Sequence, residues 1–305
     1  MPLPVIVTGA AGMIGFSVAA ALAGAGRSVV GTDVARPPEK PPFQFAAADI
    51  RDFDGLRKIV GGKADAIIHC GAISGPMLGR DRPKELADIN IGGTLNTLEI
   101  ARTTKARRYV YASTCMAYGH TPEGLSLVDE TAPLRSTDIY GASKAAGEIM
   151  TGAFARSNGV DAVALRLCWV YGPRRRTECL VRRLILAARD KTPLRLEFGG
   201  GYHRQFVYID DVVEAIVAAL DAPKIPRPVY NVTEGVRRTF AEIAAIVAEA
   251  VGPVATEFPP GPDPSDYLQQ RFSIAAIAQD LGWKPRHSLE AGVEAYAAWL
   301  NNSEY

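Results

Sequence analysis

The chain has 305 residues, and its 34 basic and 33 acidic side chains leave a net charge of +1 at neutral pH. This length suits a large α/β domain that carries a smaller lobe. Because the charges are balanced, no overall positive field attracts nucleic acid or an anionic membrane surface. No apolar run reaches the roughly 18 residues of a membrane span, and the start "MPLPVIVTGAAG" lacks the basic region of an export signal.

The four cysteines form no CxxC pair, and the four histidines lie far apart in the sequence. This spacing matches neither a zinc cluster nor a disulfide framework. We therefore expect reduced thiols, no bound metal and a cytoplasmic location.

In the first half of the chain, short apolar runs alternate with longer helical patterns. The predicted strands cover residues 5–9, 28–33, 43–48, 66–72, 107–113 and 161–167. The predicted helices cover residues 13–24, 53–60, 89–103 and 141–157. Apolar strands in strict alternation with helices indicate an α/β fold with a doubly wound parallel sheet, covered on both faces.

After Tyr171 the alternation becomes less regular. Helical patterns are found over residues 178–190, 210–221, 239–251 and 287–300. Pro-rich connections at 223–228 and 253–264 disfavour continuous helix or central strand there. We expect a main domain over residues 1–170 and a smaller lobe over 171–305, whose chain returns in places to the main sheet.

The stretch "VTGAAGMIG" places Gly9, Gly12 and Gly15 between the first strand and the first helix. Glycine permits the tight turn, the approach of backbone to a pyrophosphate and close packing of helix on strand. The helix start also offers unpaired N–H groups, those of Met13 and Ile14 included, to phosphates. The sequence therefore predicts a dinucleotide site here.

Asp33 ends the second predicted strand, 18 residues after Gly15. A carboxylate at this position accepts both hydroxyls of an adenosine ribose and repels a 2′-phosphate, which favours NAD over NADP. Arg36 and Lys40 lie close enough in sequence to serve a phosphate, so NADP stays an alternative.

Asp49 and Ile50 follow the predicted strand at 43–48 and are candidates for the edge of the adenine site. An N-cap of the next helix, at Asp49 or Asp52, explains either carboxylate equally well.

The stretch "YGASK" places Tyr140 four residues before Lys144 at a predicted helix start. Residues four apart share a helix face, and an ammonium beside a phenol lowers the phenol's pKa, as a base that takes a proton from an alcohol requires. Such a pair also arises by chance. However, "YASTCMAYG" brings the hydroxyls of Ser113 and Thr114 to the strand end, where ligands bind in parallel sheets.

Together these motifs resemble the extended short-chain dehydrogenases/reductases of the NAD-dependent epimerase/dehydratase family. The segments that carry the resemblance span nearly the whole chain: "TGAAGMIG", Asp33, Asp49-Ile50, "HCGA" (69–72), "NIGGTLNTLE" (90–99), "ASTCMAYG", "YGASK", "RLCWVYGPR" (166–174), "RQFVYIDDV" (204–212) and "LGWKP" (281–285).

The resemblance implies a Rossmann sheet with a smaller C-terminal substrate-binding lobe. It assigns the catalytic roles to Tyr140, Lys144 and Thr114, with Ser113 as the alternative hydroxyl. It further implies a homodimer through the helices near 90–104 and 140–156. Its cofactor residues, besides those already named from the motifs, are Cys70, Gly71, Ala72, Asn90, Tyr140 and Lys144.

Dehydratases of this family carry an acidic pair after the catalytic hydroxyl, where this chain has Cys115 and Met116. Removal of water would therefore lack its acid and base. We do not expect a dehydratase, and Cys115 is interpreted as a small buried residue before it is interpreted as an acid.

Nucleotide-sugar epimerases of the family usually carry an asparagine where this chain has Trp169, and an arginine near the position of Asp263. Both diphosphate contacts are therefore missing. Arg204 is retained where the family holds ligand phosphates. The substrate residues that we expect are Ser74, Thr114, Trp169, Arg174 and Arg204.

Each of these substrate assignments has a simpler alternative. Trp169 also fits ordinary core packing, and the arginines at 174–176 also fit a solvated loop. The segment 71–79 that carries Ser74 also fits a plain connection.

Three functions remain from the sequence. The first is an NAD-dependent sugar epimerase of the 4-epimerase type, which returns the hydride to the other face of the sugar. The second is a net NAD-dependent dehydrogenase of a non-nucleotide sugar or sugar acid. The third, a non-catalytic NAD-binding sensor, is disfavoured by the Tyr140–Lys144 pair.

Overall fold

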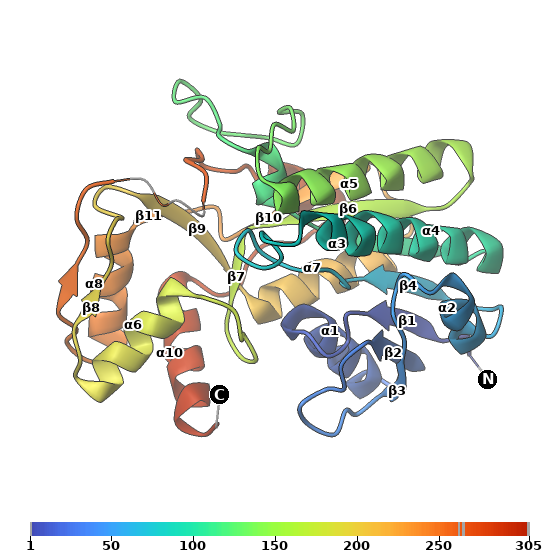
Figure 1. Cartoon of the computed structure of the whole chain (residues 1–305), viewed down its shortest axis with the longest axis horizontal. Helices are drawn as coiled ribbons and strands as arrows, with labels where there is room; N and C mark the ends of the chain where they lie inside the picture. The colour runs from blue at the N-terminus through green and yellow to red at the C-terminus, as the bar shows by residue number, and fades with distance from the viewer. Residues whose placement is uncertain (1, 262, 264–265, 304–305) are drawn as a thin grey trace.

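A computed structural model of the chain describes residues 2–261, 263 and 266–303. Its centre is a seven-stranded parallel sheet with the strand order β10-β6-β5-β4-β1-β2-β3 (Figure 1). The strands are β1 Val5–Thr8, β2 Val29–Asp33, β3 Gln44–Ala47, β4 Ala66–His69, β5 Arg108–Thr114, β6 Ala162–Leu167 and β10 Val229–Val232.

Side chains alternate between the two faces of this sheet, and both faces are covered. In β1, Val5 and Val7 join one buried cluster, which includes Val212 of helix α7, whereas Ile6 joins another, which includes Leu98 of α4. A strand that is apolar on both faces needs helices on both sides. The predicted doubly wound α/β fold is therefore confirmed.

The covering helices match the sequence pattern closely. They are α1 Met13–Gly24, α2 Phe53–Val60, α4 Gly93–Thr104, α5 Ile139–Ser157 and α7 Ile209–Asp221. None of the helices in the described part of the chain is both long and apolar enough to cross a membrane.

Two short helices were not expected: α3 Pro83–Ala87 and α9 Ala275–Leu281. They have five and seven residues, too few to establish a helical period in the sequence. The predicted helix at 89–103 also begins differently, because residues Asp88–Gly92 form a π-helical turn before α4. Such turns are rare and are frequent at functional sites.

Helices α6, α8 and α10 lie together at the left of Figure 1, and two small sheets accompany them. One sheet has the order β11-β9-β7, and the other pairs β12 with β8. These elements are β7 Trp169–Tyr171, α6 Leu180–Asp190, β8 Leu194–Arg195, β9 His203–Tyr208, β11 Arg237–Thr239, α8 Phe240–Ala250, β12 Thr256–Glu257 and α10 Leu289–Asn301.

The chain returns to the main sheet through β10, which pairs with β6 in parallel. On this basis we propose the division into a main domain over 1–170 and a C-terminal lobe over 171–305, with α7 and β10 built onto the main domain.

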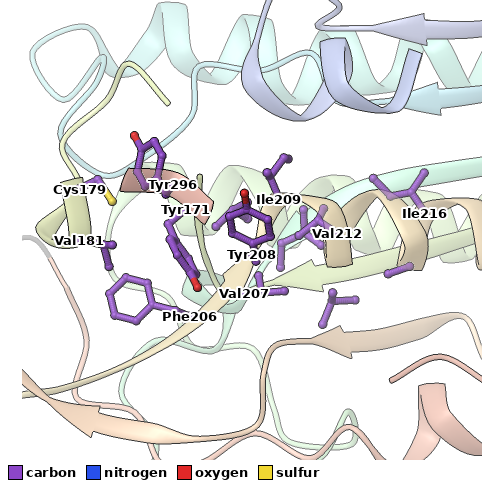
Figure 2. Close-up of a cluster of buried hydrophobic side chains, with 14 of the residues drawn as sticks. Tyr171, Cys179, Val181, Phe206, Val207, Tyr208, Ile209, Val212, Ile216 and Tyr296 are labelled. Atoms are coloured by element: carbon purple, nitrogen blue, oxygen red, sulfur yellow. The ribbon is translucent and has the colours of Figure 1, made fainter. Parts of the chain in front are cut away.

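Buried aromatic rings join the lobe to the sheet (Figure 2). Tyr171 packs edge-on against Phe206 and Tyr208, with ring centroids 5.7 and 5.4 Å apart. Val212 and Ile216 of α7 extend this cluster under the main sheet. The lobe is therefore packed against the carboxyl edge of the main sheet.

Asp211 fixes the turn before α10. Its buried carboxylate accepts the backbone N–H groups of Arg286 (2.9 Å) and His287 (3.1 Å), and its carbonyl accepts the indole N–H of Trp283. We expect Asp211→Ala to lower the free energy of unfolding by about 2–4 kcal/mol, because the backbone N–H groups of Arg286 and His287 lose their acceptor. Chemical denaturation measures the change, and Asp54→Ala, at an exposed carboxylate, is the control. An equal effect of both variants would contradict the role of Asp211.

Candidate functional site

Backbone atoms approach the glycine loop, called the cradle below, so closely that Gly9 and Gly15 leave no room for a side chain. A Cβ on Gly9 would lie 2.7 Å from the carbonyl carbon of Cys70, and one on Gly15 would lie 2.2 Å from the Gly9 oxygen. Gly9 also has a φ of +71°, which favours glycine. Gly12 is the N-cap of α1 and makes no side-chain capping bond. The first N–H groups of a helix have no partner within the helix, so those of Met13 and Ile14 suit an anion.

Asp33, at the end of β2, is held beside this loop. Its carboxylate accepts the backbone N–H groups of Ala11 (3.1 Å) and Ala35 (3.2 Å). Arg36 and Lys40 are exposed. A side-chain-free cradle at a helix start, with a fixed carboxylate at the next strand end, fits the pyrophosphate and the adenosine ribose of NAD.

The structure shows which of Asp49 and Asp52 caps the next helix. Asp52 is the N-cap of α2 and accepts the Gly55 N–H at 2.9 Å, whereas Asp49 pairs with the exposed Arg51 at 2.6 Å. Ile50 is buried, and a Cβ on Gly93 would lie 2.4 Å from its Cδ1. Ile50 therefore packs α4 closely against the sheet edge.

The segment after β4 carries Cys70, Gly71 and Ala72, and its backbone is pinned to β1. The Gly71 N–H donates to the hydroxyl of Thr8 at 3.1 Å. Burial raises the pKa of Cys70 to about 12, so its thiol stays protonated. The segment 70–72 therefore offers a cofactor backbone atoms and small uncharged side chains.

Asn90 lies in the π-helical turn and acts on neighbouring segments. It accepts the Ile73 N–H at 2.8 Å and donates to the Ile73 oxygen and to the hydroxyl of Ser143 on α5. Asn90 therefore ties the loop after β4 to the helix that carries Tyr140, which is a positioning role.

Tyr140, Thr114 and Ser74 come together at the carboxyl edge of the sheet. The Tyr140 side chain is buried, and the hydroxyls of Ser74 and Thr114 lie near its own, where they act to lower its pKa. These three residues come from α5, β5 and the loop after β4, so the fold brings two predicted substrate residues to the predicted base.

Lys144 is also buried, one turn further along α5. Its ammonium lies 4.5 Å from the centroid of the Tyr111 ring, and burial lowers its pKa to about 8. The expected lowering of the Tyr140 pKa is not found: burial raises it, although the bonds from Ser74 and Thr114 act in the opposite direction. Desolvation of the phenolate is the larger effect here.

The hydroxyl of Ser113 contacts Glu148, whereas that of its neighbour Thr114 lies near Tyr140. The Ser113 hydroxyl donates to the carboxylate of Glu148 at 3.1 Å, and Glu148 also holds the buried guanidinium of Arg166. Sequence reasoning missed Glu148, although its place four residues after Lys144 puts it on the same face of α5. The structure thus groups Thr114 with Tyr140, and Ser113 with the Glu148–Arg166 pair.

Trp169 and Arg204 lie together in the C-terminal lobe. The guanidinium of Arg204 stacks 4.0 Å from the centroid of the Trp169 indole. It also forms ion pairs with Asp263 and, at 3.0 Å, with Asp266. Both carboxylates are almost fully buried. The sequence did not single out Asp266.

Arg174 is not brought to this cluster. It pairs with Glu39 at 2.6 Å and its guanidinium lies 4.6 Å from the centroid of the Phe16 ring on α1. It also has a positive φ of 67°. Arg174 therefore lies over the cofactor half of the molecule, in contrast to its expected place beside Trp169.

A narrow cavity of about 10 Å³ connects the lobe cluster to the catalytic loop. It is lined by Cys115, Cys168, Trp169, His203, Arg204, Gln205, Asp266, Tyr267, Gln269 and Phe272. Burial and its contact with Cys168 raise the pKa of Cys115 well above its usual range, so the thiol does not supply a proton readily. No group of three or more metal-ligating side chains occurs among the described residues.

Tyr267 links this cavity to the start of α5. Its hydroxyl oxygen accepts the N–H groups of Thr137 and Asp138, each at 2.7 Å, and donates to the Asp138 carboxylate. Asp138 is the N-cap of α5, two residues before Tyr140. No sequence signal marked Tyr267, because its partner lies about 130 residues away.

The chain is similar to curated proteins along nearly its whole length. The chain is 29% identical to the UDP-glucose 4-epimerase of Mycolicibacterium smegmatis, over 97% of this chain and 98% of that protein. It is 30% identical to the dTDP-glucose 4,6-dehydratase of Streptomyces griseus, over 99% of this chain and 95% of that protein.

Solved structures agree with these relatives. The UDP-glucose 4-epimerase of Thermotoga maritima, with UDP-glucose, superposes with a TM-score of 0.88 at 25% identity, over 98% of this chain and 99% of that one. The NAD complex of the Thermus thermophilus UDP-glucose 4-epimerase gives 0.86 at 29% identity, over 99% and 100% of the two chains.

The sequence model of the NAD-dependent epimerase/dehydratase family matches residues 5–233 of the chain. This match, which spans the glycine loop, Tyr140, Lys144 and Arg204, confirms the resemblance drawn from the motifs, and with it NAD as the cofactor. The chain is therefore an enzyme that belongs to the NAD-dependent epimerase/dehydratase family.

Proposed function

We propose that the protein transfers a hydride between NAD and a secondary alcohol of a sugar, as a sugar epimerase of the 4-epimerase type. The observation that carries this proposal is the group formed by the buried Tyr140 and Thr114 and the exposed Ser74, whose hydroxyls lie together, with Lys144 one helical turn away. A phenol and a partner hydroxyl on one sugar oxygen are what alcohol oxidation needs: a base and a donor to the reacting oxygen.

In this mechanism Tyr140 removes the proton of the sugar hydroxyl while Thr114 and Ser74 hold the reacting oxygen. The bound nicotinamide supplies the hydride acceptor. Lys144 contributes positive charge that favours the phenolate, against the burial that disfavours it. Cys70 and Ala72 line the edge of the same site with uncharged groups, and Asn90 holds the loop that carries Ser74.

The relatives' printed activities support epimerisation, in which the hydride returns to the opposite face of the same carbon. One specific observation favours a second outcome. The Arg204 guanidinium, a candidate phosphate ligand, is already paired with Asp263 and Asp266. A net dehydrogenase of a non-nucleotide sugar, which releases NADH and a keto product, fits that arrangement.

The two outcomes separate in one experiment. The purified protein is incubated with excess NAD and a panel of aldoses, uronates and nucleotide sugars, while absorbance at the NADH band and the sugar products are followed. An epimer without net NADH indicates the epimerase, and accumulating NADH with a keto sugar or lactone indicates the dehydrogenase. A protein that binds NAD yet converts none of them would contradict the proposed hydride transfer.

We expect Tyr140→Phe to lower kcat by about 10²–10⁴-fold, since the variant lacks the proton acceptor but keeps the ring.

Because burial raises the pKa of Tyr140, kcat/KM for oxidation in the wild type should rise with pH. The rise should flatten near pH 8, where Lys144, with a pKa of about 8, loses its charge. A pH–rate profile of the wild type measures the rise and the point at which it flattens. An unchanged kcat in Tyr140→Phe would exclude Tyr140 as the base.

Thr114 and Ser113 form a matched pair for testing the partner hydroxyl. Thr114→Val should lower kcat by about 10²-fold, because a donor to the developing charge is lost, and Thr114→Ser should restore most of it. Ser113→Ala should leave kcat within about twofold, because its hydroxyl serves Glu148. The assignment is reversed if the Ser113 variant is the slower enzyme.

We further propose that the protein is a homodimer through α4 and α5. Leu95 on α4 is 45% exposed and Ile149 on α5 is 63% exposed, which is unusual for large apolar side chains on adjacent helices. Leu95→Glu/Ile149→Glu should halve the mass measured by light scattering. Val34→Glu, at another exposed apolar residue, is the control, and a monomeric wild type would contradict the proposal.

A further inference from the structure

Lys144 is buried without a carboxylate partner. It is 4% exposed, and it makes no ion pair with any residue in the described part of the chain. The carboxylates on the elements packed against α5 each bind another cation, in the pairs Glu148–Arg166, Glu85–Arg82, Asp88–Lys84 and Glu99–Arg102. Because a buried charge without a partner is costly, another group has to stabilise this ammonium.

The face of the Tyr111 ring takes the place of such a partner. The ammonium nitrogen of Lys144 lies 4.5 Å from the ring centroid, within the roughly 6 Å over which the negative face of an aromatic ring attracts a cation. Burial raises the pKa of Tyr111 above its ordinary value, so the phenol itself carries no charge. In a site withdrawn from water, the attraction between ring and cation is stronger than at the surface.

Close packing fixes the Tyr111 ring in this place. Gly147 lies three residues after Lys144 on α5, and a Cβ there would be 2.3 Å from the Tyr111 hydroxyl oxygen. Glycine therefore allows the helix to lie directly against the ring. The His69 ring stacks on Tyr111 with centroids 5.7 Å apart, and two threonine hydroxyls hold His69 at 2.7 and 3.0 Å. The ring is therefore confined between its neighbours on β4 and α5.

The titratable groups around Lys144 that lack an ion-pair partner are uncharged at neutral pH. Burial and the charge of Lys144 lower the pKa of His69 to about 3, and burial raises the pKa of Cys70 to about 12. Contact with Cys168 and burial raise the pKa of Cys115. Burial also raises the pKa of the tyrosines on β5, on the turn after it and on α5, which are Tyr109, Tyr111, Tyr118 and Tyr140. The charge of Lys144 is therefore offset by the ring and not by an anion.

A ring leaves the donors of the ammonium free. A lysine ammonium has three N–H donors, and a carboxylate partner would occupy part of them and raise the pKa of the lysine. The ring face attracts the charge without accepting a conventional hydrogen bond, so the donors remain for the Tyr140 phenolate and for a bound cofactor. Burial lowers the pKa of Lys144 to about 8, which still leaves it charged at neutral pH.

Building on the proposed hydride transfer, we propose that Tyr111 is a positioning residue, whose ring stabilises the Lys144 ammonium beside Tyr140 in place of a carboxylate. Tyr111 acts through Lys144. Without the ring, Lys144 loses its proton at a lower pH, and the phenolate of Tyr140 then loses the positive charge that favours it.

A direct titration of Lys144 tests the contact without any turnover. The full chain is saturated with NAD, its lysines carry carbon-13 at Cε, and the Lys144 signal is identified by its absence in Lys144→Met. Tyr111→Leu should lower the pKa of Lys144 by at least about one pKa unit, because the attraction of the ring is lost. Tyr111→Phe keeps the ring face and should cause less than half of that lowering.

Tyr109→Leu is the matched control. It removes a buried ring from the same strand and the same face, but this ring contacts Thr97 and His69 and not Lys144. The control should also cause less than half of the lowering. A lowering of less than about one pKa unit in Tyr111→Leu overturns the proposal, and so does half of that lowering or more in Tyr111→Phe or Tyr109→Leu.

Folding of the variants is checked by thermal unfolding. If Tyr111→Leu unfolds, Tyr111→Met replaces it with the same thresholds. If both unfold, the Hε protons of Lys144 in the wild type decide, because the ring current of Tyr111 should shift their resonance upfield, and an ordinary resonance overturns the proposal.

The pH–rate profile of the variants is measured separately. The pH at which the rise flattens should move down together with the pKa of Lys144, and a profile that stays in place while Lys144 titrates lower overturns the positioning role. A protein that converts none of the sugars contradicts the proposed hydride transfer and leaves the titration to judge Tyr111.

Discussion

The structure depends on the parallel pairing of β1 with β2 on one side and β4 on the other. At this point the strand order reverses direction, so the loops after β1 and β4 diverge to opposite faces and leave a crevice at the carboxyl edge. Gly9 and Gly71 meet in that crevice with backbone against backbone, where a single Cβ on Gly9 would clash at 2.7 Å. Every other part of the site, from Asp33 to Tyr140, is positioned relative to this contact.

Helix α5 is the second element on which the chemistry depends. Tyr140, Lys144 and Glu148 follow one another at four-residue spacing on its buried face. Their partners come from the neighbouring strands β5 and β6: Thr114 and the ring of Tyr111 on β5 meet Tyr140 and Lys144, and Arg166 on β6 meets Glu148. The ion pair at the far turn joins the helix to the sheet, and the near turn presents Tyr140 and Lys144 at the crevice.

Sequence reasoning succeeded where the signal is local or periodic. The bounds of α1 and α2 were predicted to the residue, because a glycine loop marks the start of α1, and an Asp52 cap and an apolar face mark α2. It failed where a side chain finds a distant partner. Neither the place of Arg174 beside Glu39 nor the contact of Tyr267 with the start of α5 leaves a trace within any short window.

The direction of the Tyr140 pKa illustrates a different limit. Spacing places an ammonium near a phenol, but it does not tell how far both are withdrawn from water. Here Tyr140 and Lys144 are 7% and 4% exposed, and burial acts on them in opposite directions, raising one pKa and lowering the other.

Burial therefore moves the two pKa values apart, because the Tyr140 pKa rises from its ordinary value while the Lys144 pKa falls to about 8. Arg204 shows the same physics in the lobe: a motif predicts the charge, and only the buried carboxylates of Asp263 and Asp266 determine what that charge can bind. A motif therefore identifies a charged residue, whereas the partners of that charge are found in the structure.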